Sequence, residues 1–449
     1  MAYMMKTNTF PRTSVFLVVF FLVAASVVLS LGTVGAAFSS PGVIVVEAGQ
    51  SIAQAVGRAS SGDVLYVKKG FYGESMIVVN KSLSIVGESA ENTIVDGGTT
   101  AQVVFQIVSN NVLLQNLTVQ NTSADLFIQA PAVRVYGVTG VIVQNVTVRS
   151  SVVGVELRSS NFTEVLRCSI SGTYSGGVLF REKSCGNVVD GSSLANNTVG
   201  IRFADMVSER NKIFHNNFEN NSQQVSSFGG ANSFDNGYPS GGNYWNNYVS
   251  VDLKSGVSQD QNGSDGILDH GFSSDNYPLA NPVTNICVQA SGREFNVQSS
   301  TNMTIAGWSF SVLEKSLGLL ARNAQGATNV VRMDIPKDVL SCESLTGWVV
   351  SLQNSDLIGL QYLSMEDSEN TYLYFTCNSV GEFEIEITGT KAVPELSLLM
   401  ITIFGAVAVL TSILARKLLR ATCFSQPGTM GTRIMSSGLI RTGILALWT

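Results

Sequence analysis

One short pattern returns at nearly constant spacing along the middle of the chain, and it limits the possible folds more than any other feature. It begins at Ala132, Gly154, Gly177 and Gly200, so that successive copies lie 22 or 23 residues apart. Each start is followed by an apolar residue, a variable residue and a second apolar residue. Each of these strand-length segments ends near a Gly, Asn or Ser residue. A period in the low twenties with such pieces is typical of a solenoid whose coils stack on one another.

Stacking buries side chains that a single coil would leave exposed. Coils about 4.8 Å apart share a dry interior, and each strand pairs in parallel with the equivalent strands of its neighbours. Val-rich runs such as residues 141–143 are typical of parallel strands, while Asn and Gly at the corners tolerate left-handed backbone angles. The signature of leucine-rich repeats is missing. We therefore predict an all-β chain built on a right-handed, single-stranded parallel β-helix.

The predicted solenoid covers residues 43–282. It includes a helical pattern near residues 51–56, which would cover the open apolar end of the first coil, and a closing loop at its other end. Residues 283–391 hold about six or seven runs of alternating apolar and polar residues, which predict a small antiparallel β-sandwich. We expect Cys342 to pair with Cys377 in this region.

Both ends of the chain carry long apolar segments. In residues 1–37 two basic residues precede an apolar core and small residues follow it, as in a signal peptide; an uncleaved helical anchor is the alternative. Residues 394–416 contain 20 consecutive uncharged residues, enough to cross about 30 Å of hydrocarbon as a helix, and basic residues follow. These signals predict an exported chain with one C-terminal transmembrane helix and with residues 417–449 as a disordered cytoplasmic tail.

The charge balance argues against one class of partner. Only 13% of the 449 residues are charged and the net charge is −6, so the chain has no basic footprint for nucleic acid. We therefore predict that nucleic acid is not a partner. Low charge together with 42 glycines suits an extracellular β-rich solenoid.

Motifs at both ends of the solenoid resemble a known family. Near its start stand Gly62-Asp63, Gly70-x-Tyr72 and Asp96-Gly97-Gly98, and near its end Gly241-Gly242-Asn243-Tyr244-Trp245 and Asp275-Asn276-Tyr277-Pro278. Over residues 51–282 the chain resembles the NosD-type β-helix family, described as periplasmic copper-binding proteins and as carbohydrate-binding or sugar-hydrolase repeats. With its C-terminal anchor, it is similar to the form found on archaeal cell surfaces. The resemblance implies a right-handed β-helix that handles carbohydrate or copper.

Two metals are candidates: copper, from the description of the family, and calcium, from an acidic cluster near the end of the solenoid. Copper needs imidazole, thiolate or thioether ligands, and the only histidines are His215 and His270, so we expect no copper site. Calcium prefers several oxygen ligands around a glycine turn. The candidate ligands are Asp260, Asn262, Asp265 and Asp269. The alternative is an acidic, solvated turn that closes the last coil, because the spacing departs from known calcium loops by one residue and lacks a closing Glu.

Charged residues recur at related positions of successive coils and are the weak catalytic candidates. Glycoside hydrolysis needs two carboxylates on one face, and a uronate lyase needs a basic group beside acidic or metal-bound groups. The candidates are Glu156, Arg181, Glu182, Arg202 and Asp205. The sequence constellations of polygalacturonases and pectate lyases are absent. The alternative is therefore a solvated, charged stripe on the solenoid.

Aromatic residues crowd the closing region and offer a binding surface, because exposed aromatic faces stack on sugar rings. They are Tyr244, Trp245, Tyr248 and Tyr277. The alternative is that they cap the apolar end of the solenoid.

We therefore expect a membrane-anchored cell-surface protein, with most of the chain outside the cell. Its β-helix would bind carbohydrate or surface-layer proteins without catalysis. A polysaccharide lyase or glycoside hydrolase acting on uronate polymers is the first alternative. A NosD-like helper in copper-site assembly is the second.

Overall fold

The computed structural model describes residues 41–323, 328–353 and 357–393. These residues belong to one compact unit that ends at Val393. The predicted signal peptide (1–37), transmembrane helix (394–416) and cytoplasmic tail (417–449) lie outside the described residues. Among the described residues, no helix is long and apolar enough to span a membrane.

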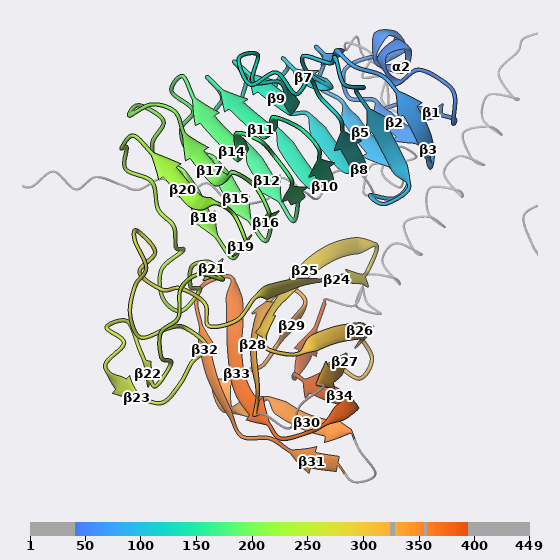
Figure 1. Cartoon of the computed structure of the whole chain (residues 1–449). Helices are drawn as coiled ribbons and strands as arrows, with labels where there is room; N and C mark the ends of the chain where they lie inside the picture. Colours follow the sequence, from blue (N-terminus) through green and yellow to red (C-terminus); the bar gives the residue numbers. More distant parts are fainter. Residues whose placement is uncertain (1–40, 324–327, 354–356, 394–449) are drawn as a thin grey trace, which may run out of the picture. The chain divides into compact units, whose positions relative to one another are not determined.

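Two parallel sheets form a right-handed solenoid of about eight turns, which confirms the predicted β-helix. Figure 1 shows the coils stacked in sequence order, from blue to green. A 14-stranded sheet follows the main path β1-β2-β5-β8-β10-β13-β16-β19-β21, with β3, β6, β12, β15 and β18 paired beside it. Its strands are β1 (Val43–Val46), β2 (Val64–Val67), β3 (Gly70–Gly73), β5 (Ser84–Gly87), β6 (Thr93–Asp96), β8 (Leu113–Gln120), β10 (Ile142–Arg149), β12 (Glu164–Leu166), β13 (Ser169–Ser171), β15 (Val188–Asp190), β16 (Ser193–Ala195), β18 (Lys212–Phe214), β19 (Asn217–Glu219) and β21 (Tyr244–Trp245).

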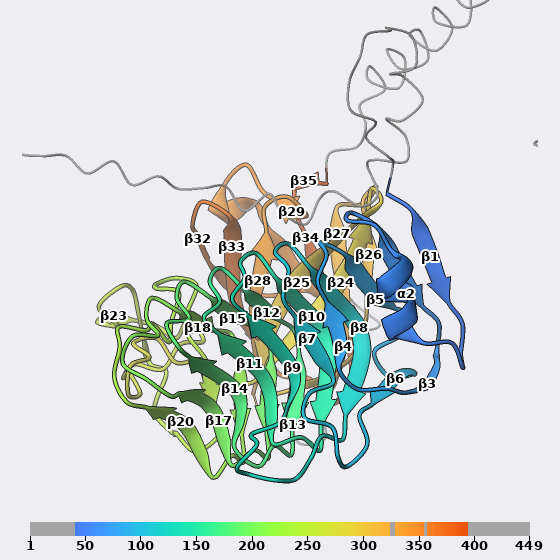
Figure 2. The same ribbon diagram turned by 90° about the horizontal axis from the view of Figure 1, so that it is seen from above.

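The second sheet of the solenoid has seven strands in the order β20-β17-β14-β11-β9-β7-β4 and lies in front in Figure 2. They are β4 (Ile77–Val79), β7 (Phe105–Ile107), β9 (Pro131–Tyr136), β11 (Val153–Arg158), β14 (Gly176–Arg181), β17 (Val199–Phe203) and β20 (Gln223–Ser227). The repeat found in the sequence lies here, because Val133, Val155, Val178 and Ile201 are paired in register on successive strands. All four are fully buried, so the repeated apolar positions form the shared core.

A single α-helix in the described residues, α2 (Ile52–Arg58), covers the first coil as the sequence predicts. Its buried face consists of Ile52, Ala55 and Val56. The Glu74 carboxylate accepts the backbone N–H groups of Ile52 and Ala53, at 2.7 and 3.0 Å. The Lys81 ammonium donates to three carbonyl groups at the other end of the helix. Both helix ends are thus satisfied, and the apolar end of the solenoid is closed.

The other end of the solenoid is closed by an irregular loop between β20 and the sandwich. It contains the short pair β22 (Lys254–Ser255) and β23 (Gln261–Asn262). Trp245 stacks on Phe218 of the last coil with ring centroids 4.2 Å apart, and its Nε1 donates to the Asp275 carboxylate. Trp245 therefore seals the core at this end.

Ten of the remaining described strands form two antiparallel five-stranded sheets around a second core, as predicted, and the other two form a separate antiparallel pair. One has the order β24-β25-β28-β33-β32 and the other β26-β27-β34-β30-β31. The elements are β24 (Val283–Ala290), β25 (Arg293–Thr301), β26 (Thr304–Ser311), β27 (Ser316–Asn323), β28 (Asn329–Pro336), β29 (Leu340–Ser341), the 3-10 helix η1 (Leu345–Gly347), β30 (Val349–Gln353), β31 (Leu357–Gly359), β32 (Tyr362–Glu366), β33 (Asn370–Cys377), β34 (Gly381–Thr388) and β35 (Lys391–Ala392).

The expected disulfide between Cys342 and Cys377 is not formed. Both cysteines are free, as are the other three in the described residues. Cys377 ends β33 of a five-stranded sheet, whereas Cys342 lies outside the strands, directly after β29, which pairs only with β35.

Candidate functional site

A set of charged side chains lies on the outer face of the seven-stranded sheet. We call it the outer ladder; its members are Arg134, Glu156, Arg158, Arg181, Glu182 and Arg202. Parallel pairing aligns Arg134 with Glu156, and Leu179 lies between Glu156 and Arg202 in the same row. The strand neighbours of the five arginine and glutamate residues within strands point into the core, so strand alternation turns these five outward, and Glu182 directly follows the end of β14.

Glu156 is the centre of the outer ladder. Its side chain has no exposed surface, although it lies on the outer face of the sheet. Arg134 Nε donates to Glu156 Oε2, and Arg181 Nη1 lies 3.2 Å from Oε1. Both arginines keep exposed surface, 20% and 28% of their side chains. The buried negative charge is therefore matched by two cations that still reach solvent.

Glu182 and Asp205 extend the ladder at the corner that follows the sheet. A side-chain hydrogen bond from Arg158, 2.8 Å away, lowers the pKa of Glu182, and Arg181 adds to the effect. Burial opposes ionisation of Asp205. However, hydrogen bonds from Ser208 and from backbone N–H groups, including that of Glu182, outweigh burial and lower the pKa of Asp205. Both carboxylates are thus held ionised.

The structure places the catalytic candidates close together. Their charges are paired with one another, unlike the two carboxyl groups of a glycoside hydrolase. Glu156, Arg181 and Glu182 form one connected ion-pair group, and Asp205 accepts a hydrogen bond from the backbone of Glu182. Arg202 lies in the same row and donates to Ser175 Oγ at 2.9 Å. A general acid in glycoside hydrolysis needs a raised pKa. The lowered pKa values of Glu182 and Asp205 suit charge pairing instead.

Sequence reasoning missed two residues of this face, Arg134 and Tyr136. Arg134 holds the variable position of the first repeat, the same position as Glu156 and Arg202, so the register alone would have included it. Arg158 lies over the ring of Tyr136, 5.2 Å from its centroid, and Tyr136 is 44% exposed. An exposed aromatic ring beside partly exposed arginines suits a polar ligand with flat apolar faces.

The predicted calcium ligands lie in the closing loop, where several carboxylates bind backbone groups. Asp269 Oδ1 accepts the N–H groups of Leu253 and Lys254, both at 2.9 Å, and the fully buried Asp265 accepts that of Ile267. Asp260 and Asn262 are exposed. Among the residues that the structure describes, no group of three or more His, Cys, Asp or Glu is arranged to hold a metal ion. Calcium binding stays a prediction.

None of the four predicted stacking aromatics presents a largely exposed ring. Trp245 is 4% exposed, and Tyr244, Tyr248 and Tyr277 are partly covered. The hydroxyl of Tyr248 donates to the carbonyl of His270, and that of Tyr277 to the carbonyl of Val257. These contacts tie the closing loop together, which agrees with a capping role.

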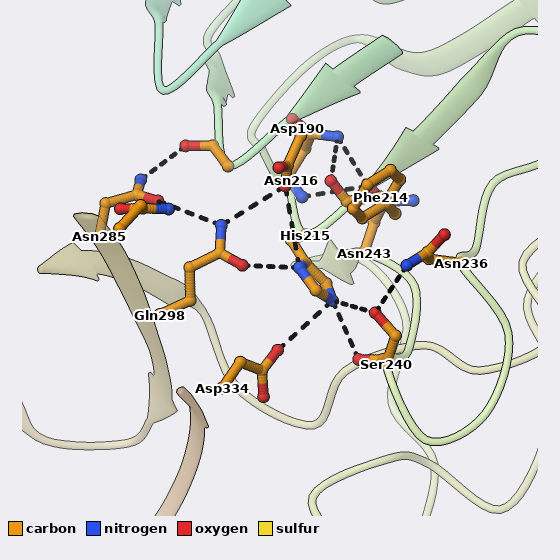
Figure 3. Close-up of polar contacts among 12 residues, drawn as sticks. Asp190, Phe214, His215, Asn216, Asn236, Ser240, Asn243, Asn285, Gln298 and Asp334 are labelled. Atoms are coloured by element: carbon orange, nitrogen blue, oxygen red, sulfur yellow. Dashed lines mark hydrogen bonds and ion pairs between the residues drawn. The ribbon is translucent and has the colours of Figure 1, made fainter. Parts of the chain in front are cut away.

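His215 lies in a buried polar network where the solenoid contacts the sandwich (Figure 3). Its Nδ1 lies 2.6 Å from Gln298 Oε1, and its Nε2 lies 2.9 Å from the carbonyl oxygen of Ser240. The carboxylates of Asp334 and Asp190 lie 3.5 and 3.8 Å from the two ring nitrogens. Both nitrogens are thus engaged by protein groups.

These contacts decide how well the chain fits copper. His215 has no free nitrogen, and the other histidine, His270, is exposed on the closing loop. Of the soft ligands, Cys168 and Cys185 are buried on the solenoid, and their thiols face the backbone carbonyls of Val143 and Val207. These two histidines and two cysteines therefore do not form the ligand set of a copper site.

Arg332 is a second buried side chain at the contact between the solenoid and the sandwich. Its Nη1 donates to the carbonyl of Asp265, and its Nη2 to that of Pro239. Its Nε lies 3.4 Å from the Asp334 carboxylate. Burial raises the pKa of Asp334, while Arg332 and His215 oppose the rise. The solenoid and the sandwich are thus joined by a desolvated group of charges.

Residues 56–250 match a family model described as "Periplasmic copper-binding protein (NosD)". Among solved structures, a pectin methylesterase from Erwinia chrysanthemi is 15% identical, with 40% of this chain and 72% of that chain covered and a TM-score of 0.27. The catalytic domain of a GH87 alpha-1,3-glucanase is 16% identical, with 56% and 51% covered and a TM-score of 0.32. A PL6 family alginate lyase is 13% identical, with 45% and 40% covered and a TM-score of 0.26.

At this level of similarity, these structures support neither an activity nor a ligand for this chain. A comparison with curated proteins finds no match.

Proposed function

Because residues 56–250 place the solenoid in the NosD family of right-handed β-helices, we propose that this chain is an exported, non-catalytic binding protein. Its ligand is an anionic polysaccharide of the uronate type. The outer face of the seven-stranded sheet is the surface that binds it.

One observation carries this proposal: the outer ladder holds its carboxylates in ion pairs while its arginines keep solvent access. Glu156 is enclosed by Arg134 and Arg181, and Glu182 is bound by Arg158. The four arginines of the ladder outnumber its two glutamates and the adjoining Asp205, so the face is locally basic on a chain of net charge −6. A local excess of cations attracts carboxylates of a polymer.

The same pairing argues against hydrolysis. A hydrolase needs one carboxylic acid that is protonated near neutral pH, and a second carboxylate placed across the bond. Glu182 and Asp205 have lowered pKa values, and Glu156 lies beneath its arginines. Binding is therefore the chemistry that these residues favour.

The location of the chain is part of the proposal. The NosD family model describes a periplasmic protein, which agrees with export by the predicted signal at residues 1–37. We propose that the segment 394–416 anchors the chain in the membrane and leaves the solenoid outside the cell. Polysaccharide and neighbouring surface-layer proteins are both within reach there.

A binding titration tests the proposal. The full-length chain in detergent is titrated with polygalacturonate, with alginate and with neutral dextran of similar length, at low and high salt. We expect binding to the two anionic polymers that weakens with salt, and no binding to dextran. Arg202→Gln should weaken binding, whereas Arg322→Gln, on an exposed pair of the sandwich, should not. Cleavage of either polymer would support the lyase or hydrolase alternative instead.

A further inference from the structure

A column of corner residues follows the seven-stranded sheet, with one residue in each of five coils. Its members are Asn111, Gly140, Phe162, Gly186 and Arg210. Each donates its backbone N–H to a carbonyl of the next coil, and each has a positive φ, between 51° and 68°. Such a backbone suits Gly and Asn but disfavours bulky side chains. Phe162 and Arg210 thus occupy positions at which Gly or Asn would cause less backbone strain.

Packing does not explain the ring of Phe162, because the side chain is 69% exposed. Its position is nevertheless accommodated by the next coil. A Cβ atom added at Gly186 would lie 3.1 Å from Phe162 Cε1, so the ring lies over a residue that lacks a side chain. Backbone strain that no burial offsets is characteristic of functional positions.

The ring borders a surface hollow of about 600 Å³. The lining includes Asn161, Phe162, Glu182, Lys183, Gly186 and Arg210. Phe162 and Arg210 are two coils apart, about 10 Å along the stack. The ring of Phe162 lies over Gly186 of the coil between them. The hollow therefore has an aromatic side at Phe162 and a cationic side at Lys183 and Arg210.

The charged side chains around this hollow differ in whether they are already paired or can bind a ligand. Glu182 is held by Arg158 and Arg181 of the outer ladder. Lys183 is exposed and forms no ion pair with any described carboxylate. Arg210 lies 3.7 Å from Glu209, but both side chains are exposed, and such surface pairs are weak. The hollow thus offers two cations beside one exposed ring.

We propose that this hollow is a subsite for one hexuronate residue of a polysaccharide, which rests on the proposed function above. The apolar face of the sugar ring stacks on Phe162, and its carboxylate binds Lys183 and Arg210. Because Glu182 belongs to both the hollow and the outer ladder, the remaining sugar residues extend onto the ladder.

The test combines affinity with stability. The full-length chain and its variants are titrated with a linear galacturonate oligomer by calorimetry, and their unfolding midpoints are measured. We expect Phe162→Gly and Lys183→Gln each to weaken binding at least about tenfold. Phe162→Gly should leave the unfolding midpoint unchanged or raised, because it removes strain and little burial. Phe127→Ala is the matched control, since Phe127 is 99% exposed on the same solenoid; its affinity should not change.

Failure of this subsite is distinguishable from failure of the proposed function. If the unaltered chain binds the oligomer and Phe162→Gly binds it equally well, the subsite is wrong and the proposed function stands. A fall in the unfolding midpoint of Phe162→Gly would also contradict the subsite, because Phe162 would then be a packing residue. If the unaltered chain binds no uronate oligomer or polymer, both proposals fail.

Discussion

The Glu156 carboxylate lies in register with Arg134 of the preceding coil and pairs with it on the outer face of the solenoid, with no surface exposed to solvent. A buried carboxylate of this kind serves as a fixed anchor for the arginines around it. The same contact predicts how the molecule responds to substitution.

Glu156→Gln should destabilise the chain by roughly 1–3 kcal/mol, because it leaves Arg134 and Arg181 without their shared anion. Glu182→Gln is the matched control. Its side chain is 42% exposed, so the loss should stay below about 1 kcal/mol. Denaturant unfolding measures both. Equal losses for the two variants would show that burial of Glu156 does not matter.

Arg332→Ala should cost about 3–5 kcal/mol, because it leaves Asp334 buried beside the solenoid without its closest cation. Arg322→Ala provides the comparison, since Arg322 is 62% exposed and pairs with Glu382 at the surface. Its cost should remain under about 1 kcal/mol. The measurement is again denaturant unfolding, and a small loss for Arg332→Ala would contradict the described contact.

The closing loop should lose stability as the pH rises. Burial raises the pKa of Asp252 to about 6, and the nearby Asp265 and Asp269 carboxylates add to the rise. Because the folded pKa exceeds the unfolded value, the folded state binds more protons between about pH 4 and 6, and stability falls as the pH rises through that window. The loss should be at most roughly 3 kcal/mol, since one pKa unit corresponds to about 1.4 kcal/mol. Thermal unfolding from pH 4 to 7 measures it, and Asp252→Asn should flatten the slope. A stability that increases over this window would exclude the assignment.

Calcium would act on the same loop. If Asp260, Asn262, Asp265 and Asp269 bind it as the sequence predicts, Ca²⁺ at neutral pH should raise the unfolding midpoint more than Mg²⁺ does. Asp260→Asn should remove the effect, because Asp260 is exposed and its substitution should not disturb the loop itself. An unchanged midpoint with Ca²⁺ would refute the calcium site.

The repeat predicted the solenoid because each coil needs its neighbours to bury Val155, Val178 and Ile201. The same register predicts that Glu156 and Arg202 share a row on the outer face, and the structure confirms this. The repeat thus predicts which residues of the outer ladder share a row, as well as which residues form the core.

Other contacts have no signal in the repeat. His215 contacts Gln298, which lies 83 residues later in the sequence, and no periodic pattern relates the two residues. The closing loop is irregular, so its hydrogen bonds could not be predicted from its composition. Phe162 resembles any exposed aromatic residue until its positive φ and the neighbouring Gly186 are known.

The most direct test of the central claim is a calorimetric titration of the full-length chain with polygalacturonate, followed by analysis of the polymer's length. The outer ladder predicts salt-sensitive binding that Arg202→Gln weakens and that leaves the polymer intact. The absence of binding, or a polymer shortened by the unaltered chain, would contradict a non-catalytic binding face.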